Sequence, residues 1–170
     1  EALTVVMDDI KKRGVETIYC LGDVIGYGPN PRECIEIIQK SCEFTLCGNH
    51  EEAVLFNAED FNPKARRAID WTREQLNSDK YDKDKNYALW DFLGELRKKV
   101  REDNALYVHA SPRQPTREYV LPKDIKDKPK IDSIFSEFEG AEICFVGHTH
   151  IPGVFTDDVQ FRYARQLDNR

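Results

Sequence analysis

The chain has 170 residues, of which 33% are charged and 40% hydrophobic, and its formal net charge is −6 at pH 7. This length and composition are typical of one globular domain, and we predict a single domain over residues 1–170. No apolar run approaches the roughly 20 residues that span a bilayer, so a membrane partner is not expected. The acidic balance also disfavours a nucleic acid as partner.

The hydrophobic pattern of the first 50 residues predicts alternating helices and strands. The expected elements are helices at 1–12 and 31–40 and strands at 16–21 and 43–47. Gly14 is placed to end the first helix, and Asn30-Pro31 reads as the cap and first position of the second. A glycine-rich loop joins the first strand to the second helix.

A strongly charged helical insert is expected over residues 51–99, followed by short strands. Within the insert, Asn62-Pro63 predicts a helix start, 77–85 reads as an exposed loop and 86–98 as a helix. Further along, the pattern predicts strands at 105–109 and 142–146, a helix at 131–138, and a hairpin formed by 154–156 and 159–163. Alternating helices and strands imply βαβ units, so we predict an α/β fold with mostly parallel pairing that finishes in antiparallel strands.

All four histidines lie in three short motifs, each directly after a strand-like run. These motifs are Gly48-Asn49-His50-Glu51, Val108-His109-Ala110-Ser111-Pro112 and Gly147-His148-Thr149-His150, and Gly22-Asp23 follows a fourth run. In open α/β sheets, ligands bind at the carboxyl ends of the strands. Imidazole, carboxylate and amide oxygen form a ligand set for divalent metals, so the sequence predicts a metal site there.

Each residue also has a simpler interpretation when it is taken alone. Asp23 is a common turn or capping residue, and His109 could be a hydrogen-bonded core histidine. His148 and His150 carry more weight, because residues two apart in an extended segment project to the same side. A structural zinc site is disfavoured, since no cysteine is adjacent to a histidine. The five cysteines include no Cys-x-x-Cys pair, which favours reduced thiols and a cytoplasmic location.

In order and spacing the four motifs resemble those of the calcineurin-like metallophosphoesterases, specifically a prokaryotic branch of small single-domain members. The matching text is Gly22-Asp23-Val24-Ile25-Gly26-Tyr27-Gly28-Pro29, Gly48-Asn49-His50-Glu51, His109-Ala110-Ser111-Pro112 and Gly147-His148-Thr149-His150. The resemblance covers nearly the whole chain. It implies a layered α/β/β/α sandwich with two mixed sheets and the metal site at the C-terminal ends of the strands.

The resemblance also implies a dinuclear phosphoesterase that holds two divalent transition metal ions (Mn, Fe, Zn, Ni or Co). A small phosphomonoester, phosphodiester or nucleotide polyphosphate would be hydrolysed by attack of a metal-bound hydroxide. Asp23 would bridge both ions, and His150 would bind the first. The second ion would be completed by Asn49, His109 and His148. His50 would be the catalytic group that faces the leaving group, with Glu51 placed to orient it.

One departure from the family pattern keeps a second function open. The family's first motif, Asp-x-His, is missing before the helix at 1–12, so we expect the sequence to begin just after it and to stop short of the closing strands. Asp23 and His150 alone make a weak first site. The alternative is therefore a non-catalytic metal-binding module, although the retained His50 speaks against it. Tyr27, Asn30, Arg113 and Tyr119 are possible substrate contacts, and the oligomeric state stays open.

Overall fold

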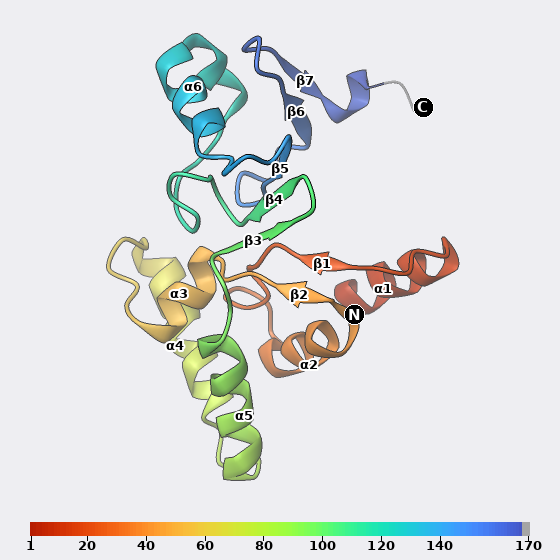
Figure 1. Ribbon diagram of the computed structural model, residues 1–170. Helices are drawn as coiled ribbons and strands as arrows, with labels where there is room; N and C mark the ends of the chain where they lie inside the picture. The colour runs from red at the N-terminus through yellow and green to blue at the C-terminus, as the bar shows by residue number, and fades with distance from the viewer. Residues whose placement is uncertain (168–170) are drawn as a thin grey trace. The chain divides into compact units, whose positions relative to one another are not determined.

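The computed structural model describes residues 1–167 (Figure 1). Its packing divides the chain into two compact units, Glu1–Arg97 and Lys98–Arg170. The prediction of a single domain over 1–170 stays a prediction. No helix among the described residues is long and apolar enough to cross a membrane.

The first unit is mostly helical around a short parallel strand pair. Its elements are α1 (Ala2–Lys12), β1 (Tyr19–Cys20), α2 (Pro31–Ser41), β2 (Phe44–Thr45), α3 (Asn49–Leu55), α4 (Pro63–Leu76) and α5 (Lys83–Gly94). β1 pairs with β2 in parallel, and α2 forms the crossover between them. Loops that follow two neighbouring parallel strands leave the same edge of the sheet. The Asp23 loop after β1 and the Asn49 motif after β2 are therefore neighbours.

The core of this unit lies under that edge. The largest buried cluster consists of Ile25, Ile35, Ala53, Val54, Ala58, Ile69, Leu76, Leu89 and Leu93. Ile25 belongs to the Asp23 loop and Ala53 to α3, so the apolar core anchors both segments that carry predicted site residues. Burial of such side chains stabilises by roughly 1.5–3 kcal/mol each, which makes the loop a fixed part of the unit.

Helix boundaries in this unit partly confirm the predictions. α4 begins as expected, since the Asn62 side chain accepts hydrogen bonds from the amides of Lys64 and Ala65. The predicted loop begins at residue 77 as expected, but the helix predicted at 86–98 has different bounds. Asp82 caps α5 by accepting from the Asp84 amide, so the helix starts at Lys83, and it ends at Gly94. α2 starts after Asn30, but the Asn30 side chain donates to Glu33 instead of capping the helix.

The second unit combines a mixed sheet, one α-helix and a hairpin. Its elements are β3 (Lys99–Glu102), β4 (Ala105–Val108), η1 (Pro122–Lys126), α6 (Lys128–Ser136), β5 (Ile143–Phe145), β6 (Gly153–Phe155), β7 (Phe161–Tyr163) and η2 (Ala164–Gln166). The sheet order is β3-β4-β5, with β3 antiparallel and β5 parallel to β4. β6 and β7 form the predicted antiparallel hairpin.

β3 was not predicted, and its sequence explains why. Of Lys99-Val100-Arg101-Glu102 only Val100 is buried, so no apolar run signals a strand. Its pairing with β4 defines it, through a tight turn in which Asp103 has a φ of +51°. The α/β class predicted from the sequence is confirmed, with a parallel pair in the first unit and a mixed sheet in the second.

Candidate metal centre

In the first unit, the loop after β1 presents Asp23 in a left-handed backbone conformation. Its φ is +57°, and Gly22 and Gly26 on either side have φ values of +100° and +124°. The loop is tied to α3 by the Glu51 carboxylate. Glu51 Oε2 accepts the Asp23 amide at 2.8 Å, and Glu51 Oε1 accepts the Ile25 amide at 3.2 Å. The strained Asp23 backbone is thus held by a specific partner.

Glu51 itself is fully buried and gathers backbone donors. Besides the amides of Asp23 and Ile25, its Oε2 accepts the Gly48 amide at 2.8 Å. The pKa of Glu51 is raised to about 7: burial raises it most and the charge of Asp23 also raises it, while the three backbone hydrogen bonds lower it. These described contacts hold the loop and the helix start together. The predicted role of Glu51 in orienting His50 stays a prediction.

The start of α3 lies against Asp23 at a distance that only glycine permits. A Cβ on Gly48 would lie 2.3 Å from Asp23 Oδ1 and 2.6 Å from the Asp23 amide nitrogen. Two residues later, the His50 amide donates to Asp23 Oδ1 at 3.1 Å. The structure therefore brings Asp23 to the first turn of α3, where Asn49 and His50 lie.

The His50 ring is enclosed by aromatic neighbours. It is 7% exposed, and it meets the Tyr27 ring at 4.6 Å between centroids and the Phe61 ring at 5.2 Å, both in edge-to-face geometry. A Cβ on Gly26 would lie 2.0 Å from His50 Nδ1, so the loop backbone packs directly on the imidazole. The ring orientation of His50 is consequently fixed by packing.

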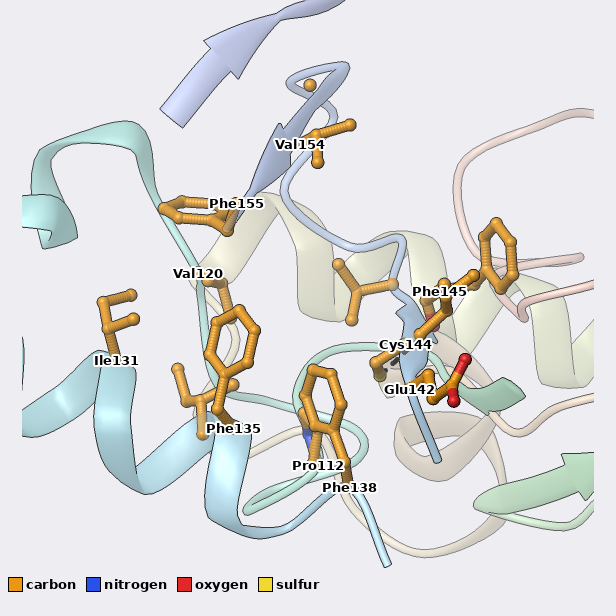
Figure 2. Close-up of a pocket in the computed structure, with 14 residues that line it drawn as sticks. Pro112, Val120, Ile131, Phe135, Phe138, Glu142, Cys144, Phe145, Val154 and Phe155 are labelled. Carbon is orange, nitrogen blue, oxygen red and sulfur yellow. Dashed lines mark hydrogen bonds between the residues drawn. The ribbon is translucent and has the colours of Figure 1, made fainter. Parts of the chain in front are cut away.

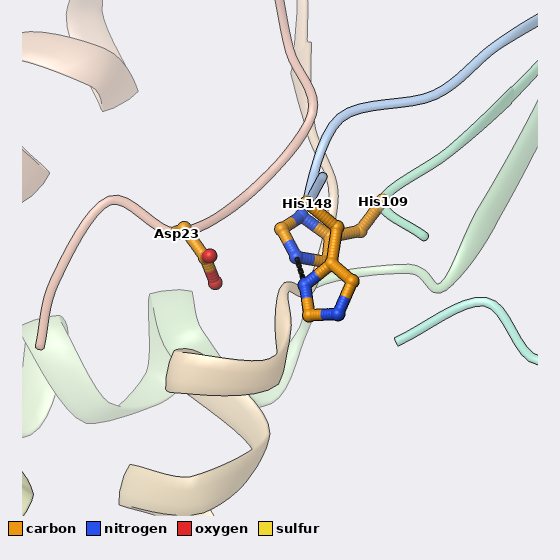
Figure 3. Close-up of side chains that lie close together, drawn as sticks. All are labelled: Asp23, His109 and His148. Atoms are coloured by element: carbon orange, nitrogen blue, oxygen red, sulfur yellow. Dashed lines mark hydrogen bonds between the residues drawn. The ribbon is translucent and has the colours of Figure 1, made fainter. Parts of the chain in front are cut away.

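In the second unit, two of the predicted ligands come together. His109 follows β4 and His148 follows β5, and because these strands are parallel neighbours, both residues leave the same edge. The Gly147 amide donates to the His109 carbonyl at 2.8 Å, which extends the pairing past the strands. His109 Nε2 and His148 Nδ1 face each other at 3.2 Å (Figure 3). Both side chains are buried, with 2% and 9% of their surface exposed.

This nitrogen–nitrogen distance allows a test of whether a metal fits. Two imidazole nitrogens that bind one ion at about 2.0–2.1 Å lie about 2.9–3.4 Å apart at octahedral or tetrahedral angles. The observed 3.2 Å falls inside that range. The same distance also suits a hydrogen bond between the rings in the absence of an ion. The separation of the two nitrogens therefore fits two ligands of one ion.

The glycine–histidine–threonine–histidine motif adopts a turn and is not extended. His148 and His150 have φ values of +52° and +57°, and the Thr149 amide donates to the Gly147 carbonyl. The predicted same-side projection of the two imidazoles is therefore wrong, because it assumed an extended segment. His150 is exposed.

Left-handed backbone conformations coincide with the predicted ligands. Six non-glycine residues of the described chain have a positive φ: Asp23, Asp103, Glu139, His148, His150 and Val159. Three of the six are predicted metal ligands. Such conformations cost on the order of 1–3 kcal/mol for a non-glycine residue and persist where the surroundings enforce them, often at functional sites. In both units, predicted metal ligands therefore have a strained, left-handed backbone conformation.

The loop after β4 supports the histidine pair from the side. The Ser111 hydroxyl donates to Glu118, and Arg113 pairs with the same carboxylate, with an Nε–Oε2 distance of 3.1 Å. The Arg113 hydrogen bond holds the pKa of Glu118 below its usual range. The next residue, Tyr119, packs its ring on His148 at 4.1 Å between centroids. The sequence suggests Arg113 and Tyr119 as possible substrate contacts. In the structure, Arg113 contacts Glu118 and Tyr119 contacts His148, so both side chains stabilise the loop.

The donor set suits a divalent transition metal. Figure 3 draws Asp23 from the first unit and His109 and His148 from the second, and each offers one ligand atom, a carboxylate oxygen or a ring nitrogen. Nitrogen and oxygen donors of this kind bind manganese, iron, cobalt, nickel and zinc. Asn49, a predicted ligand, has an amide oxygen that carries no charge.

An apolar pocket in the second unit lies apart from this chemistry. It has a volume of about 340 Å³ and is lined by side chains from α6, β5 and β6, such as Phe135 and Phe155, and by Phe138 from the segment after α6 (Figure 2). Glu142 is the one charged residue of its lining, and no histidine takes part. The pocket therefore offers no ligand set for a metal or a phosphate.

Comparison with known sequences finds a relative that is longer than this chain. An uncharacterized protein of Methanocaldococcus jannaschii is 34% identical over 162 residues, which cover 93% of this chain and 60% of that protein. The chain thus spans about 60% of the length of the curated relative that it matches.

Two solved structures share the fold of this chain. A metallophosphoesterase from Sphaerobacter thermophilus superposes with a TM-score of 0.71 at 29% identity, over 96% of this chain and 64% of that one. A hypothetical protein from Pyrococcus horikoshii also gives a TM-score of 0.71, over 94% of this chain and 68% of that one, and at 18% identity it shows the fold alone. The family model described as calcineurin-like phosphoesterase matches residues 1–152. The chain therefore belongs to the calcineurin-like phosphoesterase family, whose members are associated with divalent metals and phosphoester hydrolysis.

Proposed function

We propose that the protein is a dinuclear metal-dependent phosphoesterase that hydrolyses a phosphomonoester, a phosphodiester or a nucleotide polyphosphate. Family membership supports the reaction class. The observation that carries the proposal is the buried histidine pair, whose facing nitrogens lie at a distance that two ligands of one ion adopt. A hydrogen-bonded core pair would not require His148 to take a left-handed backbone.

The proposed metal ligands are the residues of the four motifs. We assign to this set Asp23, Asn49, His109, His148 and His150. Two divalent transition metal ions held by these groups, drawn from Mn, Fe, Zn, Ni and Co, would neutralise the phosphoryl oxygens and lower the pKa of a water nucleophile. The cations also allow a protein of net charge −6 to hold an anionic substrate.

The remaining chemistry falls to side chains of the first unit. His50 is proposed to face the leaving group and to donate a proton or a hydrogen bond to its oxygen. Packing against Tyr27 and Phe61 fixes the ring, so little orientational entropy is lost when the substrate arrives. Asp23 is fixed in turn by the Glu51 carboxylate and the His50 amide.

Metal content and turnover, measured on one sample, test this function. The metal is quantified by plasma mass spectrometry, and hydrolysis of bis-p-nitrophenyl phosphate is followed with and without added manganese. We expect about two ions per chain and metal-dependent turnover. One ion or none, with no turnover in manganese, would contradict the enzyme and favour the non-catalytic metal-binding module.

Two variants separate the proposed roles. Asp23→Asn should abolish binding of both ions, because the bridging carboxylate becomes an amide. His50→Gln should retain the ions and lower kcat, on the order of 10²- to 10⁴-fold for a general acid. Loss of metal from the His50 variant would disprove the role assigned to that side chain.

A reducing compartment suits the thiols of this chain, and we propose the cytoplasm. Burial raises the pKa of Cys20 to about 11 and that of Cys144 to about 12, which keeps both as neutral thiols. The structure describes no disulfide within residues 1–167. A small phosphate compound remains the proposed partner.

A further inference from the structure

We propose that the exposed ring of Tyr27 is a stacking platform for a flat aromatic leaving group, so that the substrate is an aryl or nucleoside phosphoester. This inference rests on the proposed function, in which His50 faces the leaving group. It goes beyond that function because it names the class of leaving group and the residue that selects it.

The first step is the position of the Tyr27 ring. Its centroid lies 4.6 Å from that of His50, and the interplanar angle is 66°. Even so, 67% of the Tyr27 residue is exposed. The contact with His50 therefore uses only part of the ring, and much of its aromatic surface stays open to solvent directly beside the proposed proton donor.

The second step is a comparison with the other aromatic neighbour of His50. Phe61 contacts the same imidazole at 5.2 Å and is partly buried against the apolar core of the first unit. Burial of apolar surface accounts for Phe61. It does not account for Tyr27, which leaves most of its surface in water.

The third step is that the loop backbone holds the Tyr27 segment on His50. Gly26 has a φ of +124°, and a Cβ at this position would lie 2.0 Å from His50 Nδ1. The residue before Tyr27 thus lies in direct contact with the imidazole. This contact places the backbone next to Tyr27 against the imidazole, and the Tyr27 ring itself meets the imidazole at 4.6 Å between centroids.

These distances set the chemistry of the ligand. A leaving-group oxygen within hydrogen-bond reach of His50 lies about 2.6–3.2 Å from a ring nitrogen. A planar ring joined to that oxygen directly or through a sugar can then reach the open face of Tyr27, since aromatic pairs form at centroid separations of about 4.5–7 Å. Stacking is tolerant of ring identity, so the platform selects flat rings in general, with nucleobases as the biological class.

Binding of two phosphonates tests the platform without hydrolysis, because a phosphoesterase does not break their carbon–phosphorus bond. Phenylphosphonate and methylphosphonate are titrated calorimetrically into the manganese-loaded protein. We expect phenylphosphonate to bind roughly 5- to 100-fold more tightly, as one stacked ring would give. Tyr27→Ala should remove this preference by weakening phenylphosphonate far more than methylphosphonate, whereas Tyr27→Phe should keep it.

Phe56→Ala is the matched control. Phe56 is 73% exposed in the same unit, and it has no ring contact with His50 among the described residues, so its loss should leave the preference intact. The platform is overturned if the wild type shows no preference, if it binds neither phosphonate, or if Tyr27→Ala weakens both ligands equally.

Turnover of bis-p-nitrophenyl phosphate on the same samples keeps the two proposals apart. Turnover without a preference for phenylphosphonate would overturn the platform and leave the hydrolase standing. A Tyr27-dependent preference without turnover in manganese would overturn the hydrolase and leave the aromatic site standing.

Discussion

The two segments that carry the predicted metal ligands are stabilised in different ways. In the first unit, the Asp23 loop is held from within by the buried Glu51 carboxylate, which accepts three backbone amides. In the second unit, His109 and His148 meet at the ends of neighbouring parallel strands. The loop after β4, which contains the Arg113–Glu118 ion pair, packs Tyr119 on His148. Both segments use left-handed backbone at a ligand position, at Asp23 and at His148.

The predicted ligands are therefore held in position in two different ways. A buried carboxylate that gathers amides is sensitive to the loss of a single acceptor, because an unsatisfied buried donor costs about 1–3 kcal/mol. A pair of side chains at strand ends depends on sheet register and tolerates changes in the surrounding loop. We therefore expect substitutions around Asp23 to affect folding and metal together, and substitutions around His148 to affect mainly the metal.

Gly48→Ala should have the largest effect. The new Cβ would lie 2.3 Å from Asp23 Oδ1 and 2.6 Å from the Asp23 amide nitrogen, and backbone cannot move aside as a flexible side chain can. We expect loss of bound metal together with about 3 kcal/mol of stability, at the upper end of typical overpacking costs. Urea unfolding and plasma mass spectrometry measure both. Gly28→Ala is the control, since a Cβ there meets nothing within 4 Å, and equal losses in the two variants would contradict the close-approach argument.

Glu51→Gln should destabilise the first unit by about 1–3 kcal/mol. The amide group of glutamine supplies one acceptor oxygen where the carboxylate supplies two, so at least one of the amides of Asp23, Gly48 and Ile25 loses its partner. Urea unfolding provides the measurement. The exposed Glu36→Gln is a control that removes a charge without a buried hydrogen bond. A Glu51 variant as stable as that control would show that the buried carboxylate does not hold the loop.

His148→Asn should separate metal binding from folding in the second unit. Asparagine adopts a positive φ more readily than most residues, so the backbone is kept while the imidazole is lost. We expect the affinity for manganese to fall at least about tenfold, the lower end of what loss of a metal's outer partners costs, with a small change in stability. His148→Val should reduce the affinity for manganese by the same factor. It should also lower the free energy of unfolding by a further 1–2 kcal/mol or so, because a β-branched residue is strained at this φ. Equal stability of the two variants would argue against backbone strain at His148.

The smallest effect concerns the ion pair of Asp124 with Lys130, which lie 2.6 Å apart. Burial opposes ionisation of Asp124, but the hydrogen bonds from Lys130 and the Leu121 amide outweigh it, and its pKa lies below the ordinary 3.8. The stabilisation is therefore complete above about pH 3.8 and is lost as the pH falls through the lower folded-state pKa. We expect Asp124→Asn to cost up to about 1 kcal/mol at pH 7 and less near pH 3. A cost independent of pH would show that packing, and not the charge, is responsible.

Several elements could be predicted from local sequence, and others could not. α4 followed from Asn62-Pro63, since a cap and a first-turn proline act within four residues. β3 was missed because its single buried residue, Val100, gives no periodic signal, and the strand exists through its pairing with β4. The start of α5 was missed because the charged stretch before it resembles a loop, whereas Asp82 caps a helix there.

The sequence by itself determined the family and the types of residue in the site. Four motifs after strand-like runs carry the carboxylate, amide and imidazole donors, and ligand chemistry depends only on residue type and order. The tertiary structure alone decided their geometry: the Glu51 hydrogen bonds, the 3.2 Å approach of His109 to His148, and the left-handed turn that makes His150 diverge from an extended course. The contacts join residues up to 39 positions apart, and the left-handed conformations have no periodic pattern of residue types. Neither can therefore be predicted from the order of residues along the chain.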